Sequence, residues 1–207
     1  MDILITIFSL IVLLFSVIIH ELAHGSVAYS LGDPTAKYEG RLTFNPIKHL
    51  DPFGSIILPL LLFISGSSVL VGWAKPVPIN PYNFRDQKWG SLKVAIAGPA
   101  SNIVLALFFG LAIRFLPVSF FVAVPGILII FSFIVQINLM LAFFNLIPIP
   151  PLDGHWILFS ILPPGFETAK TFLQQYGIFI LIFLIFIGAL QGLNTIVFNL
   201  FSLITGI

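Results

Sequence analysis

Apolar residues run through this chain in long blocks separated by short polar segments. Three blocks cover residues 3–31, 92–116 and 121–146, and a fourth apolar stretch covers residues 172–207. A helix needs ~20 apolar residues to cross a bilayer, so each of the first three blocks is long enough for one span. The fourth stretch is interrupted at residues 188–192, which predicts one span followed by a second helix or half-span.

Two segments depart from this pattern. Residues 35–50 are polar, and their loosely alternating β-type residues predict a small β-hairpin near the cytoplasmic face. Residues 52–74 are apolar, but Pro59 and a Ser-Gly run divide them into pieces too short to span. Basic residues flank this segment on both sides, so the positive-inside rule favours a re-entrant segment over a short tilted span.

The composition is typical of a membrane protein. The 207-residue chain is 58% hydrophobic and only 8% charged, whereas ordinary soluble domains carry about 25% charged residues. The net charge of +1 includes no basic run, which argues against nucleic-acid binding, and the lack of cysteine excludes thiolate ligands. We therefore expect one all-α, multi-pass domain over residues 1–207, with four to five transmembrane helices, in the cell membrane. Its motif-bearing core would cover residues 1–155.

Charge also predicts the orientation in the membrane. The first block is too long for a signal-peptide core and lacks a preceding positive region, so we expect it to be retained. If residue 1 lies outside, the first block exits inward, the second outward and the third inward. Eight of the nine Lys and Arg residues then lie on the inner side, with Arg114 as the exception.

The first block contains the motif His20-Glu21-Leu22-Ala23-His24. Residues i and i+4 share one helix face, so the two imidazoles can hold one zinc ion with Glu21 beside them. In H-E-x-x-H hydrolases the glutamate activates the metal-bound water. Ionisable groups inside a membrane helix are costly and therefore indicate function, although a histidine there can also serve as an interhelical hydrogen-bonding group.

A catalytic zinc site takes three protein ligands, so a third must come from elsewhere in the chain. Asp153 is favoured because it follows a proline-rich break at the inward end of the third block, at a depth similar to that of the histidines. Broken helices at membrane depth are expected only around a cavity or a site. The other candidates considered are Asp33, Glu39, His49, Asp51 and His155.

Three further features accompany these motifs. Alternating prolines make residues 75–80 an extended strip, which either guides an unwound substrate or serves as a stiff connector. Asn102, near Pro99 in the second block, is expected to form an interhelical hydrogen bond. Asn145 at the end of the third block is either a donor to the reaction's oxyanion or a structural cap.

With these motifs, the chain resembles the site-two protease family of intramembrane zinc metalloproteases, which pair H-E-x-x-H with a downstream N-x-x-P…D-G motif. Here the second motif runs from Asn145 and Pro148 to Asp153-Gly154, and residues 73–80 and 97–102 also look like family features. The resemblance implies a Zn²⁺ cofactor with Asp153 as third ligand, and transmembrane protein or peptide substrates within the lipid bilayer. The chain resembles a compact member without room for PDZ or CBS domains.

The predicted activity is hydrolysis of peptide bonds near the cytoplasmic face. Glu21 would take a proton from the zinc-bound water, and Asn145 is the candidate oxyanion donor. One alternative is a transporter or channel that uses buried His, Glu and Asp, but the sequence has no internal repeat and its ionisable groups converge on one place. The other is an inactive, client-binding family member, although the glutamate and all three ligand candidates are present.

Overall fold

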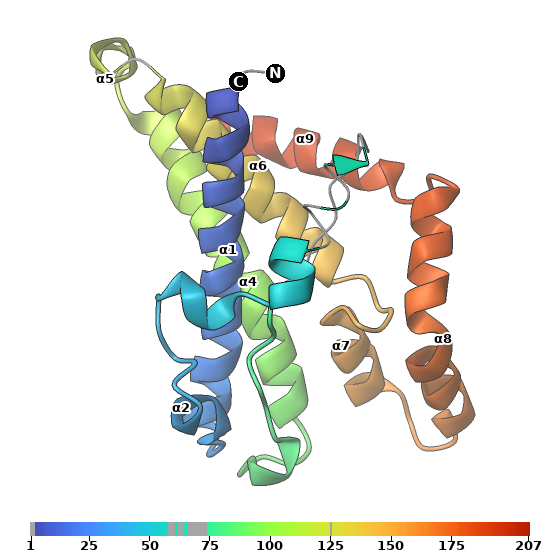
Figure 1. Cartoon of the computed structure of the whole chain (residues 1–207). Coiled ribbons are helices and arrows are strands. Elements are labelled where there is room, and N and C mark those ends of the chain that lie inside the picture. The colour runs from blue at the N-terminus through green and yellow to red at the C-terminus, as the bar shows by residue number, and fades with distance from the viewer. Residues whose placement is uncertain (1–2, 58–60, 62–63, 66–73, 125) are drawn as a thin grey trace.

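Figure 1 shows the computed structural model of the chain, which describes residues 3–57, 61, 64–65, 74–124 and 126–207. Its long helices are α1 (Ile3–Ser30), α4 (Gly90–Phe115), α6 (Ile127–Asn145) and α8 (Glu167–Phe186). Within the described residues, four segments are long and apolar enough to cross a membrane: Ile7–Ser30, Gly90–Phe115, Ile127–Asn145 and Glu167–Phe186. The predicted all-helical, multi-pass architecture is therefore confirmed.

Shorter elements connect or flank these helices. They are α2 (Thr35–Tyr38), η1 (Pro46–His49), η2 (Pro52–Ile57), η3 (Pro81–Asn83), α5 (Val118–Ala123), α7 (Gly154–Ile161) and α9 (Gln191–Thr205). The predicted interruption after α8 is present, and the 15-residue α9 lies across one end of the bundle instead of beside α8 (Figure 1). Both chain ends lie at that same end of the bundle.

The predicted β-hairpin in residues 35–50 is wrong, because this segment forms α2 and η1 and contains no strand. Gly40, with a φ of 62°, ends the first helical turn, and Asn45 caps η1 by accepting a hydrogen bond from the Ile47 N–H. An isolated two-stranded hairpin is only marginally stable, and the described residues offer it no third strand. Of the predicted re-entrant segment, residues 52–57, 61, 64–65 and 74 are described; re-entry itself falls largely outside the described residues and stays a prediction.

Helices α1, α4 and α6 pack together and place the site among them. At the end near α9, Ala106, Val135 and Leu139 form a buried core with Val197 and Phe201 of α9. At the opposite end, Ala28 of α1 packs with Phe84 and Val94. The polar residues described next lie between these two apolar clusters.

Candidate metal centre

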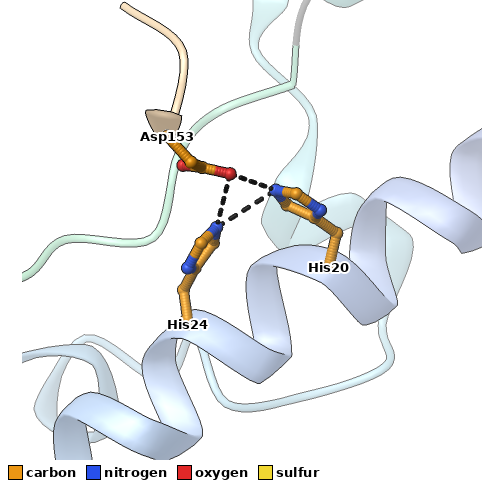
Figure 2. A group of neighbouring side chains, drawn as sticks. All are labelled: His20, His24 and Asp153. Atoms are coloured by element: carbon orange, nitrogen blue, oxygen red, sulfur yellow. Dashed lines mark hydrogen bonds and ion pairs between the residues drawn. The ribbon is translucent and has the colours of Figure 1, made fainter. Parts of the chain in front are cut away.

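Three predicted ligands from distant parts of the chain meet at one point. His20 and His24 occupy successive turns of α1, and Asp153 directly precedes α7 (Figure 2). The Asp153 Oδ2 atom lies 3.0 Å from His20 Nε2 and 3.2 Å from His24 Nε2, and the two Nε2 atoms are 3.0 Å apart. Both imidazoles are buried, with 5% and 6% of their residues' surface exposed.

In each imidazole, the hydrogen-bond partner of Nδ1 determines which ring nitrogen carries the hydrogen. His24 Nδ1 lies 2.6 Å from the Val94 carbonyl oxygen, and His20 Nδ1 lies 2.6 Å from Asn102 Oδ1. Both partners are acceptors, so each neutral imidazole must carry its hydrogen on Nδ1. Each Nε2 is then left with a lone pair, and both lone pairs point toward the Asp153 carboxylate.

This arrangement of acceptors fits a metal cation. Two imidazole lone pairs and a carboxylate oxygen at such short separations repel one another unless a positive charge lies between them. Ligands about 2.0–2.1 Å from a tetrahedral zinc ion are about 3.3 Å apart, close to the separations observed. Within the described residues, His20, His24 and Asp153 are the one group of three or more His, Cys, Asp or Glu side chains whose ligand atoms lie close enough together to hold a metal ion.

The remaining side of the cluster is bounded by Gly98 of α4. A Cβ atom at this position would lie 2.3 Å from His24 Nε2 and 2.5 Å from His20 Nε2. Because Gly98 has no side chain, the space next to the two Nε2 atoms stays open. In the sequence, residues 97–102 were recognisable only as a feature that looks like the family's, and nothing there indicated this role of Gly98.

Glu21 and Asn145 line the same cavity as the three ligand candidates, and the cavity has a volume of about 560 Å³. The Glu21 Oε2 atom accepts a hydrogen bond of 2.7 Å from the Val77 N–H, so the extended strip directly holds this carboxylate. Asn145 Nδ2 donates to the Leu141 carbonyl at 2.9 Å. Pro76, Val77 and Ile79 form another wall of the cavity.

The other candidate ligands do not join the cluster. Glu39 is exposed, Asp51 accepts hydrogen bonds from the N–H groups of Phe53 and Gly54, and His49 bonds the Thr43 carbonyl through Nε2. His155 donates from Nδ1 to the Leu152 carbonyl, and burial lowers the pKa of its imidazole.

Asp33 has a structural role instead. Its fully buried side chain accepts hydrogen bonds from the Asn80 N–H at 2.7 Å, from Asn83 Nδ2 at 2.8 Å and from Thr35. Burial alone would raise the pKa of this carboxyl, but the donors outweigh it and hold the pKa below its ordinary value. Asp33 thereby joins the end of α1 to the strip that lines the cavity.

Comparisons with known proteins agree with this chemistry. The model of "Peptidase family M50" matches residues 117–184. The "Putative zinc metalloprotease YwhC" of Bacillus subtilis is 43% identical over 185 residues, which cover 87% of this chain and 80% of that protein. The similarly named MJ0611 of Methanocaldococcus jannaschii is 34% identical over 165 residues, covering 76% of this chain and 72% of the relative.

A third relative is longer than this chain. The "Putative zinc metalloprotease Rip2" of Mycolicibacterium smegmatis is 32% identical over 179 residues, covering 86% of this chain but 66% of that protein. No solved structure matches the chain.

Proposed function

Because the chain belongs to peptidase family M50, we propose that it is an intramembrane zinc metalloprotease that cleaves membrane-embedded proteins or peptides. The observation that carries this proposal is the convergence of two imidazole lone pairs and a carboxylate beside Glu21 in one cavity. His24 lies six residues before the end of α1, or about 9 Å at 1.5 Å per residue. Cleavage would therefore occur inside the membrane, near the end of the bundle that carries most of the basic residues.

His20, His24 and Asp153 would hold the zinc ion. When bound there, zinc supplies a Lewis acid that lowers the pKa of water and polarises a peptide carbonyl. Glu21 accepts the proton of the attacking water and delivers it to the leaving amine. The Val77 N–H holds Oε2 of Glu21, which leaves Oε1 to exchange the proton.

Asn145 is the proposed donor to the developing oxyanion. A side-chain amide carries two N–H donors, and one of them bonds the Leu141 carbonyl. The second is left to donate to a substrate oxygen in the cavity that Asn145 lines.

The extended strip is the proposed binding edge for the substrate. A helical substrate must unwind before attack, because its carbonyls are engaged in intrahelical bonds, and pairing with an extended strand offsets part of that cost. Arg41 supports the strip by donating from Nη2 to the carbonyls of Lys75 at 2.6 Å and Pro76 at 3.2 Å.

The test is cleavage of a transmembrane peptide by purified protein in liposomes. We expect a metal chelator to abolish cleavage and added zinc to restore it. Glu21→Gln should retain zinc and cleave at least ~100-fold more slowly, the lower range for loss of a general base. Glu39→Gln, which changes an exposed loop acid, is the matched control and should cleave normally. Metal or proton flux without any cut peptide would instead support a transporter.

A further inference from the structure

A buried row of polar side chains joins three membrane helices beside His20. Ser16 of α1 is 4% exposed, and Asn102 of α4 and Asn138 of α6 are both 0% exposed. Burial of an amide in an apolar environment costs several kcal/mol, on the order of 2–7, unless its hydrogen bonds are made. Each polar group in this row should therefore have a partner, and its partners determine its orientation.

The hydrogen bonds form a continuous path from α6 to the metal ligand. Asn138 Nδ2 lies 2.8 Å from the Ile134 carbonyl and 2.9 Å from Ser16 Oγ. Asn102 Nδ2 lies 2.8 Å from Asn138 Oδ1 and 3.3 Å from the Ser16 carbonyl. At the end of the path, Asn102 Oδ1 lies 2.6 Å from His20 Nδ1.

Backbone carbonyls give this path a single direction. A carbonyl can only accept, so the side of Asn138 that faces Ile134 must be its NH₂ group, and its oxygen faces Asn102. Asn102 must then donate toward Asn138 and present its own oxygen to His20. The His20 hydrogen is thereby placed on Nδ1, which leaves Nε2 free for a metal.

The second histidine needs no such path. His24 Nδ1 bonds the Val94 carbonyl directly, so a backbone group determines its tautomer. The tautomer of His20 depends instead on side chains from two other helices. Substitutions in the buried row should therefore affect His20 and leave His24 unchanged.

We propose that Asn138 is a positioning residue that fixes the tautomer of His20 through Asn102, and thereby sets the metal affinity of the site. This inference rests on the proposed zinc site. Loss of a residue that orients a metal ligand typically weakens metal binding 10- to 100-fold. Asn138 lies one hydrogen bond further away, and the Ser16 carbonyl keeps a longer contact with Asn102, so we expect about a tenfold loss for Asn138→Leu.

The experiment measures zinc affinity by competition with a chelator, together with the histidine ¹⁵N shifts of the metal-free protein. Asn138→Leu and Asn138→Ala should each raise the zinc Kd about tenfold and populate the Nε2–H form of His20, with His24 unchanged. His20→Gln identifies the signals. Thr205→Val is the matched control, since it removes a buried hydroxyl of α9 whose two partners, the Phe201 carbonyl and the Ile207 N–H, lie outside the path.

A double-mutant cycle separates positioning from simple helix packing. In an Asn102→Ala background, Asn138→Leu should have little further effect on the zinc Kd, because the path is already broken. An unchanged Kd and unchanged His20 shifts in both Asn138 variants would overturn the inference while leaving the zinc site intact. Absence of zinc binding by the unaltered protein would instead overturn the proposed function.

Discussion

Gly98 shows how one residue without a side chain can be required by a metal site. A Cβ atom there would meet both His Nε2 atoms at 2.3–2.5 Å, well inside van der Waals contact. We predict that Gly98→Ala lowers zinc affinity at least tenfold, although alanine is about 1 kcal/mol better than glycine within a helix. Zinc titration and thermal unfolding of the metal-free protein measure the two effects separately.

Gly192→Ala is the matched control for this substitution. Gly192 is also helical, and a Cβ atom at this position meets nothing within 4 Å beyond its chain neighbours and the adjacent backbone of its own helix. Its zinc affinity should be unchanged. Equal affinities in the two variants would show that the α4 backbone does not limit the space around the ligands.

The sequence predicted those site residues whose placement is local. A four-residue spacing puts His20 and His24 on one helix face whatever the rest of the fold, and the proline break marked Asp153. Their convergence is seen in the structure, whereas their role as ligands stays a prediction. Gly98 and Asn138 were missed because their importance depends on how α4 and α6 are rotated toward α1, and composition does not determine that rotation.

Asp33 is predicted to stabilise the protein in a pH-dependent way. Asp33→Asn turns an acceptor into a donor that faces the N–H groups of Asn80 or Thr35, which should cost about 1–3 kcal/mol of unfolding free energy. Because the folded pKa of Asp33 lies below its ordinary value of 3.8, the stabilisation is complete above that pH and is lost as pH falls through the folded pKa. The Tm of Asp33→Asn should therefore lie furthest below that of the unaltered protein at neutral pH, and the difference should shrink in acid.

Thermal unfolding in detergent between pH 3 and 7 measures this deficit. Asp86→Asn is the control. The Asp86 carboxylate is partly exposed and pairs with Lys93 at the surface, so this substitution should lower Tm far less. If the Tm difference between Asp33→Asn and the unaltered protein grew as the pH fell, the pKa of Asp33 would not be lowered in the folded protein.

At the scale of elements, the strip formed by residues 75–80 connects the proposed general base, Glu21, to the polar loops. It is held at one end by Arg41, at the other by Asp33, and between them by its bond to Glu21. The alternating prolines predicted a strip without helix, and residues 74–80 form no helix in the structure, because proline fixes φ and removes the N–H locally. The loose β pattern of residues 35–50 was misleading, since a strand also needs a neighbour that the pattern cannot supply.

We predict that Val77→Pro slows peptide cleavage without loss of zinc. Proline removes the N–H that holds Glu21 but suits the extended backbone between Pro76 and Pro78. A hydrogen bond to a charged acceptor contributes about 1.5–3 kcal/mol, so the rate should fall roughly 10- to 100-fold. Val77→Ala, which keeps the N–H and shortens the side chain, is the control in the same cleavage assay and should stay within a few-fold of the original rate.

At the scale of the whole molecule, four candidate spans and a crosswise α9 place both chain ends at the same end of the bundle (Figure 1). The α4–α5 turn lies at that end, whereas the segment before α4 lies at the opposite one. All Lys and Arg residues except Arg114 belong to the segments that we assign to the inner side. The positive-inside rule then predicts that Ser119 faces outward and Lys88 faces the cytoplasm.

The absence of native cysteine makes this orientation directly measurable. Ser119 and Lys88 are both exposed, so Ser119→Cys and Lys88→Cys each give one accessible thiol. In intact cells, a membrane-impermeant maleimide should label Ser119→Cys, and it should label Lys88→Cys only after permeabilisation. The reverse pattern would place the His20, His24 and Asp153 cluster near the outer face, and the proposed cleavage would then occur on the other side of the membrane.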